Sequence, residues 1–186
     1  MSLLTIHPEN RPDEAVAIRD PETIADALWK AGVLFERWTV EHAFRPDASQ
    51  EEIIAAYQNS VNRLIDRYEF RTADVISLRP DHPDKLALRE KFLSEHTHAE
   101  FEVRFFVEGR GLFYLHVGDQ VLVMLCEQGD LLSIPAGVKH WFDMGEQPDF
   151  KCIRLFSNPD GWVAHYTGDP IAKSFPAFEQ YLTQYA

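Results

Sequence analysis

The sequence predicts a mainly β fold of the jelly-roll or barrel type, preceded by N-terminal helices. In the first part of the chain the apolar residues recur at the helical spacing of about 3.6 residues, whereas from residue 101 they alternate with a period of about two. Turn signals rich in Gly, Pro and Asp then divide the second part into segments of about ten residues. Short strands at such intervals are typical of a sandwich or small barrel.

Three helices are expected in the N-terminal half. Residues 20–32 begin with Asp-Pro and end at a glycine, as many short helices do. Residues 48–70 carry the strongest signal, because Ser49 and Glu52 can form a capping box ahead of an apolar stripe. A third helix begins in residues 82–96 and must break before the last of them. The apolar stripe of the second helix consists of Ile53, Ile54, Tyr57, Val61, Leu64 and Ile65.

Six strands are expected from residue 101 onward. The Gly-Arg-Gly sequence at 109–111 is interpreted as a hairpin turn between the first two, because it lacks the strand–loop–helix setting of a phosphate-binding loop. The tail is mixed, with a short helix around residues 177–182. The predicted strands lie within residues 101–109, 110–119, 120–130, 131–137, 139–145 and 149–157.

No linker or repeat divides the chain, so a single domain is expected over residues 1–186. It would consist of a helical N-terminal part (1–95), a barrel core (96–157) and a C-terminal tail (158–186). Cys126 and Cys152 lie in apolar runs and are expected to be buried free thiols.

The charge balance argues against two classes of partner. The chain has 30 acidic and 18 basic residues, and its formal net charge of −12 repels phosphate backbones and anionic lipid. Nucleic acid and membrane partners are therefore not expected. No apolar run approaches the roughly 18 residues of a membrane helix, and no signal peptide is recognised. We expect a cytoplasmic protein, with a monomer as the working hypothesis.

The stretch EHTHAEFE, residues 95–102, contains three potential metal ligands. His96 and His98 are two residues apart and Glu102 has the same parity, so an extended strand would place all three on one face. The alternative is a polar lead-in to a buried strand, which is the commoner role of an isolated His-x-His.

A second element downstream favours the metal site. Pro135 and Gly137 predict a turn that directs His140 back across the sheet. Imidazole and carboxylate ligands suit a borderline divalent ion. With four protein ligands, an octahedral ion would keep two positions for a substrate.

Two arginines are candidates for catalysis. Arg104 shares the parity of Glu102, so it too would face inward, where it needs an anion to meet: either Glu102 or a substrate oxygen. A salt bridge at the barrel rim is an equally weighted alternative. The same two roles, contact with an anion inside the barrel or a salt bridge at its rim, are open for Arg154 on a later strand. We expect Arg104 to affect substrate binding more than metal binding.

The spacing of these residues resembles the two cupin motifs. Residues 96–109 read H-x-H-x-x-x-E-x-x-x-x-x-x-G, and residues 129–140 read G-x-x-x-x-x-P-x-G-x-x-H. The second motif often ends in Asn four residues after its His, whereas Met144 stands here. Within the cupins, the run E-x-R-F-x-x-x-G-x-G-x-F at 102–113 and the helical N-terminal third resemble acireductone dioxygenases.

The resemblance implies a cupin-type β-barrel and one Fe²⁺ or Ni²⁺ ion per chain, held by four ligands. It also implies cleavage of an acireductone by O₂ in methionine salvage. Iron would give a 2-keto acid and formate, and nickel a shorter carboxylic acid, formate and carbon monoxide. The implied ligands are His96, His98, Glu102 and His140.

Aromatic side chains near the site could form an apolar pocket for the methylthio tail of such a substrate. Core packing is the alternative for each, and we expect it to hold for at least one. His116, a lone strand histidine, is left out of the site, and Glu100 is expected to be solvated. The pocket candidates are Phe92, Phe106, Phe142 and Trp162.

Two other functions are compatible with the same ligands. One is a cupin isomerase that polarises the carbonyl of a sugar or keto acid, and the other is a non-catalytic cupin with a structural metal. Oxygen consumption would distinguish a dioxygenase from both.

Overall fold

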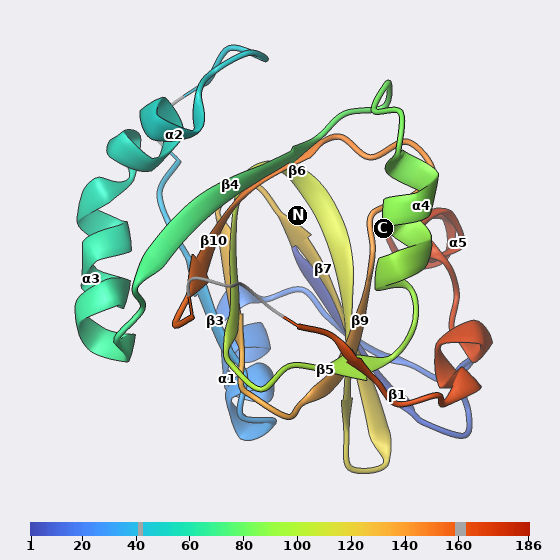
Figure 1. Ribbon diagram of the computed structural model, residues 1–186. Helices are drawn as coiled ribbons and strands as arrows, with labels where there is room; N and C mark the ends of the chain where they lie inside the picture. The colour runs from blue at the N-terminus through green and yellow to red at the C-terminus, as the bar shows by residue number, and fades with distance from the viewer. Residues whose placement is uncertain (41–42, 159–162) are drawn as a thin grey trace.

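The computed structural model describes residues 1–40, 43–158 and 163–186, which form two antiparallel sheets that share the long strand β6 (Glu102–Val117) (Figure 1). We name them sheet A and sheet B. Sheet A has the order β11 (His165–Tyr166), β5 (His96–Thr97), β9 (Lys139–Asp143), β6, β7 (Gln120–Glu127), β1 (Leu3–Pro8) and β2 (Val16–Ile18). Sheet B has the order β4 (Thr72–Leu78), β10 (Phe150–Phe156), β6, β8 (Asp130–Ile134) and β3 (Leu34–Arg37).

Strand β6 passes from one sheet to the other at Gly109–Gly111. Its first half pairs with β8 and β10, and its second half pairs with β7 and β9. The expected hairpin turn at 109–111 is therefore wrong. The two glycines instead lie within one continuous strand, at the point where it changes sheets. A glycine is required at 109 (φ 73°), because a Cβ there would lie 1.9 Å from the carbonyl oxygen of Asp149.

The expected helices exist but are shorter or divided. The described helices are α1 (Pro21–Lys30), α2 (Gln50–Ala56), α3 (Gln58–Tyr68), α4 (Lys85–Phe92), α5 (Phe178–Tyr185) and a 3₁₀ turn, η1 (Pro170–Ser174). The capping box of Ser49 and Glu52 is confirmed. The single helix expected over 48–70 is divided at Tyr57, where i→i+3 hydrogen bonds tighten the backbone between α2 and α3.

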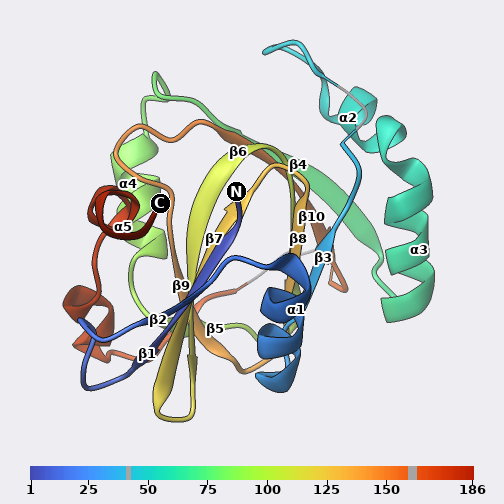
Figure 2. The ribbon, with the colours of Figure 1, turned by 180° about the vertical axis from the view of Figure 1, so that it is seen from behind.

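The N-terminal part also supplies strands, which the expectation of a helical segment missed. Strands β1 and β4 each pair with a strand of the barrel core, β7 and β10. Helices α2 and α3 cover the outer face of sheet B, α1 packs at the back, and α4 and α5 lie on the other side (Figures 1 and 2). Among the described helices, none is long and apolar enough to cross a membrane.

Covering both faces of sheet B buries residues 102–107 of β6. Val103, Phe105 and Val107 pack outward against Ile53 and Tyr57 of the α2–α3 segment. Glu102, Arg104 and Phe106 are buried as well, on the opposite face. The polar side chains Glu102 and Arg104 therefore lie in the interior between the two sheets.

Candidate metal centre

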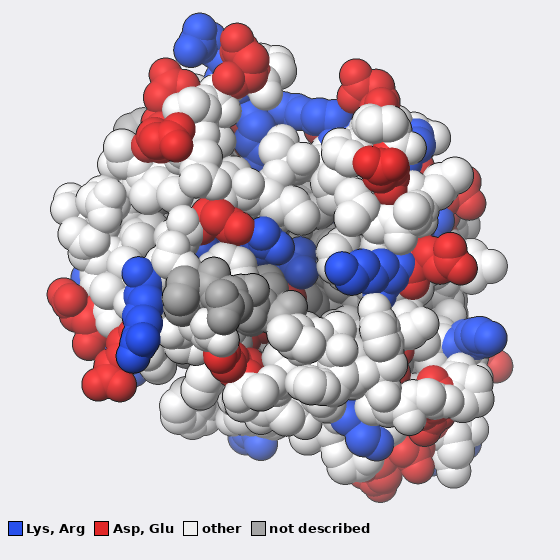
Figure 3. All heavy atoms as spheres, in the orientation of Figure 1, with Lys and Arg blue, Asp and Glu red and all other residues white. Residues whose placement is uncertain are grey.

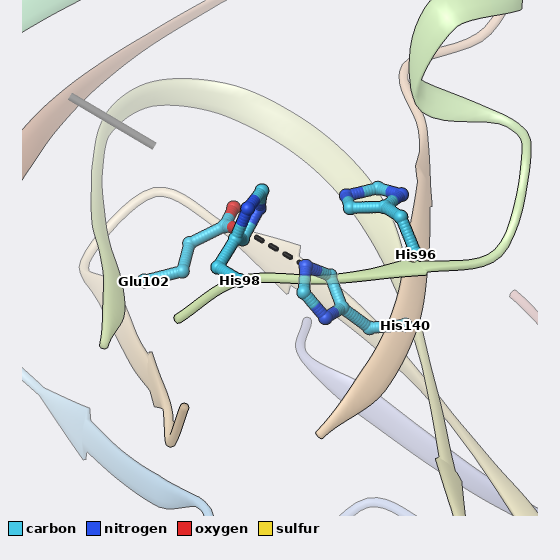
Figure 4. Close-up of side chains that lie close together, drawn as sticks. All are labelled: His96, His98, Glu102 and His140. Carbon is cyan, nitrogen blue, oxygen red and sulfur yellow. Dashed lines mark hydrogen bonds and ion pairs between the residues drawn. The ribbon is translucent and has the colours of Figure 1, made fainter. Parts of the chain in front are cut away.

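Four potential ligands converge between the sheets, and each comes from a different local structure. His96 lies on β5, His98 in the bend that follows, Glu102 at the start of β6, and His140 on β9. One ligand atom from each lies within 4.8 Å of the others, and all four side chains are buried (Figure 4). The arrangement brings together the four residues selected from the sequence.

The route to this arrangement differs from the one expected. Strand β5 contains only His96 and Thr97, so His98 and Glu102 do not share a strand with His96. His96 instead pairs with His140 across β5 and β9. The Gly137 N–H donates to the carbonyl of His98 at 2.9 Å, so the predicted Pro-Gly turn holds the bend that carries this ligand.

The three imidazoles are oriented in the same way. Each Nδ1 contacts a backbone carbonyl: His96 that of Ser94 at 2.7 Å, His98 that of Val163 at 2.9 Å, and His140 that of Val138 at 2.8 Å. A carbonyl can only accept, so Nδ1 carries the proton and Nε2 is left as an electron-pair donor. Imidazoles that ligate metals are oriented in this way.

The contacts of Glu102 indicate what this donor set would hold. The Nε2 atoms of His98 and His140 both lie 3.0 Å from its Oε2. With Nδ1 already protonated, such a contact requires either an imidazolium or a shared cation. A divalent cation satisfies all the lone pairs at once, so the residues fit a metal ion.

The electrostatics show that Glu102 keeps its negative charge and favours a positive charge beside it. Burial would raise the pKa of Glu102, but the charge of Arg104 and the hydrogen bonds from His140 and His98 hold it well below its usual range. Burial lowers the pKa of His96 to about 4, with a contribution from His140, so its imidazole is neutral. Burial also opposes protonation of His98, but the hydrogen bond and charge of Glu102 outweigh it and raise the pKa.

The ligands lie in a cavity of about 750 Å³ that opens on the face seen in Figure 3, where a hollow has basic side chains along its edge. Four of the residues selected from the sequence line it: Arg104, Arg154, Phe92 and Phe142. Phe106 does not, because it packs in the core against Phe113 and Phe150 at centroid distances of 6.5 and 6.2 Å. Trp162 lies outside the described residues.

The two arginines have partners of different kinds. The Nε of Arg104 donates to Oε1 of Glu102 at 2.7 Å, and its guanidinium lies 4.9 Å from the centroid of Phe142. Arg104 was expected to meet either Glu102 or a substrate oxygen, and in the structure it contacts Glu102. Arg154 donates two hydrogen bonds, at 2.7 and 2.5 Å, to Asp74 on the adjacent strand β4.

Sequence reasoning missed several residues of the cavity wall. Asp74 lies opposite Arg154 in the β4–β10 register, and no pattern within its own segment marks it. Lys91 lies at the end of α4, one residue before Phe92. The remaining missed residues are Thr72, Ile76, Leu88, Phe156, Val163, Ala164 and Tyr166.

Comparisons with known proteins place the chain among proteins of one family. The family model described as ARD/ARD' family matches residues 4–164. The chain is 59% identical over 186 residues to an acireductone dioxygenase of Methylococcus capsulatus, covering all of both chains. It is 56% identical over 163 residues to one of Aquifex aeolicus, covering 88% of this chain and 89% of the other.

A solved structure supports the fold. It is an acireductone dioxygenase from Bacillus anthracis with a cadmium ion in the active centre, 29% identical, with a TM-score of 0.79. The match covers 89% of this chain and 98% of that one. The expected cupin-type β-barrel and the resemblance noted from the sequence are both confirmed. By its length of match and its identity to these relatives, the chain belongs to the ARD/ARD' family.

Proposed function

We propose that the protein is a metal-dependent dioxygenase that cleaves the acireductone 1,2-dihydroxy-3-keto-5-methylthiopentene with O₂ in methionine salvage. One observation carries the proposal: three oriented imidazoles and a buried carboxylate converge within 4.8 Å at the base of an open cavity. Membership of the ARD/ARD' family supports it. The cavity leaves room beside the ligands for a molecule of the size of the substrate.

We propose one ion per chain, Fe²⁺ or Ni²⁺, held by His96, His98, Glu102 and His140. Three neutral imidazoles and one carboxylate suit either ion. When bound, the ion supplies a Lewis acid to which both oxygens of an enediolate can attach.

Arg104 and the backbone carbonyls position these ligands. Arg104 fixes Oε1 of Glu102, so that Oε2 faces the histidines. The carbonyls of Ser94, Val163 and Val138 fix each ring. Because these side chains are buried and fixed before the substrate arrives, little reorganisation is needed when charge develops there.

The wall of the cavity offers separate places for the two ends of the substrate. We propose that Arg154 contacts the polar end, where its pairing with Asp74 keeps the guanidinium in place. Phe92 and Phe142, whose rings lie 6.4 Å apart, would contact the methylthio tail. Trp162 stays a candidate for the same pocket.

The remaining parts of the proposal concern location and partners. We infer a cytoplasmic monomer that acts on small molecules and binds neither nucleic acid nor membranes. The formal net charge of −12 supports the exclusion of anionic polymers and lipid surfaces.

The test is reconstitution of the apo protein separately with Fe²⁺ and Ni²⁺. We expect O₂ consumption and loss of substrate absorbance with both ions, and carbon monoxide only with nickel. Identical products from both samples, at verified metal content, would contradict control by the metal while leaving the dioxygenase intact. Loss of absorbance without O₂ uptake would favour the isomerase.

A further inference from the structure

Glu95, the residue before His96, is buried although it contacts none of the four ligands through its side chain. Its exposed fraction is 1%, and its two oxygens have different partners. Oε2 lies 2.6 Å from Nδ1 of His116 on β6, and Oε1 accepts a hydrogen bond from the hydroxyl of Thr167 at 2.7 Å. The Glu95 carbonyl also accepts from the Thr167 N–H at 3.1 Å. Glu95 therefore joins the barrel to the chain just beyond β11.

The segment Val163–Thr167, which we call the strap, runs along the edge of the metal centre. Its strand β11 pairs with β5, and in Figure 1 it crosses beside β5 in red. The Val163 carbonyl is the one that orients His98, and Val163, Ala164 and Tyr166 line the cavity. The strap thus contributes both to a ligand and to the wall of the substrate site.

Little apolar burial holds the strap in place. The exposed fractions of Val163 and Tyr166 are 63% and 51%. Besides an edge contact of the Tyr166 ring with His96 at 5.8 Å, the strap is attached by polar contacts. These are the β5–β11 pairing, the Tyr166 hydroxyl to the Lys91 carbonyl at 3.1 Å, and the bonds between Thr167 and Glu95. Among these side-chain contacts, the one to Glu95 has a buried, anchored acceptor.

We propose that Glu95 is a positioning residue that holds the strap against β5 through Thr167, and thereby keeps the Val163 carbonyl on His98. His116 keeps the Glu95 carboxylate in place, and the carboxylate of Glu9 contacts the other nitrogen of this imidazole at 3.0 Å. The effect on His98 follows because a strap that opens takes the carbonyl of Val163 with it. This inference rests on the proposed metal site but not on the identity of the substrate.

The variant Thr167→Val tests the inference with little risk to folding. It keeps the shape of an exposed side chain and leaves the Glu95–His116 contact intact. Substituting a residue that helps to orient a metal ligand typically lowers metal affinity about 10–100-fold. In this variant we expect the metal to dissociate about ten times faster, and the backbone amide of residue 167 to exchange its hydrogen about ten times faster. KM should rise more than kcat falls.

Two matched variants complete the experiment. Thr167→Ser restores the hydroxyl and should return exchange, metal dissociation and KM to those of the unaltered protein. Thr183→Val makes the same change at an exposed position of α5, where the hydroxyl donates to the Glu179 carbonyl. It should leave metal dissociation and exchange at Thr167 unchanged.

The outcomes separate this inference from the proposed function. If Thr167→Val and Thr183→Val do not differ in exchange at Thr167 or in metal release, Glu95 does not hold the strap. A uniform rise in exchange with a lowered Tm would also overturn the inference, because it would reduce Glu95 to a general stabilising contact. If the unaltered protein holds no metal at its four ligands, the metal site fails, while exchange still tests the attachment of the strap.

Discussion

Two buried carboxylates lie on different strands, Asp143 on β9 and Glu102 on β6, and their surroundings differ. Asp143, at the end of β9, is completely buried and receives four hydrogen bonds: two from Arg89 at 2.7 and 2.9 Å, and one at 2.9 Å from each of the N–H groups of Gly145 and Phe178. Every donor is a fixed part of the protein. Asp143 therefore fastens α4 and the start of α5 to the barrel.

Glu102, at the start of β6, is equally buried but has a different set of neighbours. Among the described residues, Arg104 is its one permanent donor. The other two contacts are Nε2 atoms whose rings already donate through Nδ1. The comparison shows how two buried carboxylates can be distinguished. The one satisfied by the protein stabilises the fold, and the one facing lone pairs is suited to a cation.

The largest effect that the comparison predicts is loss of metal in His98→Ala or His140→Ala. Removing one imidazole leaves three of the four ligands, and we expect metal retention and activity to be abolished together while the fold remains. Elemental analysis of the purified variants, with their circular dichroism, measures both. His82→Ala, in the loop before α4, is the control and should keep its metal. Full occupancy in either ligand variant would defeat the assignment.

Asp143→Asn is expected to have the opposite effect, lowering stability while sparing the site. Removing one partner of a buried ion pair costs about 3 kcal/mol or more, which lowers the Tm by about 10 °C in a protein of this size. Thermal unfolding of the apo protein measures it. Glu146→Gln, which loses a contact to Arg89 across 3.7 Å at an exposed position, should change stability by less than about 0.5 kcal/mol. Equal Tm values for the two variants would show that Asp143 is dispensable.

The cluster of potential ligands and the general fold could be predicted from the sequence because both depend on local patterns. A change from helical to alternating periodicity indicates the barrel, and His96, His98 and His140 stand at motif spacings beside turn residues. The strand parity used to group them was nevertheless wrong, since β5 ends at Thr97. The motif spacing alone is enough to group these residues, and the fold determines their geometry.

What could not be predicted depends on pairings between distant segments. Asp74 and Arg154 are partners through the β4–β10 register, and Thr167 meets Glu95 through the β5–β11 pairing. Burial on both faces of β6 likewise hides which residues face the cavity, which is why Phe106 was placed there. Such contacts follow from topology, which periodicity does not encode.

The two arginines of the cavity can be distinguished in the same way as the two carboxylates. The contact of Arg104 with Glu102 changes the expectation that its loss would spare the metal. We now expect Arg104→Ala to weaken metal binding about 10–100-fold, because Glu102 loses its fixed donor. Arg154→Ala should keep its metal and raise KM about tenfold, as expected for loss of a charge-assisted contact to substrate. Metal titration and steady-state kinetics of both variants measure these effects. Unchanged metal affinity in Arg104→Ala would restore the substrate role inferred from the sequence.

The smallest predicted effect concerns Phe142. Its ring contacts Arg104 on the Glu102 side, while its neighbour in sequence is Asp143. A Cβ on Gly111 would lie 2.4 Å from the Cζ of Phe142, and the ring is confined by Phe113 at 4.7 Å and Phe150 at 5.9 Å. Gly111→Ala should therefore displace the ring into the cavity at a cost of about 1–3 kcal/mol, as overpacking does.

We expect Gly111→Ala to keep its metal but to raise KM several-fold, together with a Tm lowered by a few degrees. Gly118→Ala is the matched control: its φ of 63° makes an alanine strained, but an added Cβ would meet nothing within 4 Å. The control should lose a similar stability of about 1–2 kcal/mol without any change in KM. If both variants show the same KM, the ring of Phe142 does not set the shape of the substrate site, and its contact with Arg104 serves packing alone. If KM rises only in Gly111→Ala, Phe142 shapes the substrate pocket beside Glu102, although its neighbour in sequence, Asp143, stabilises the fold.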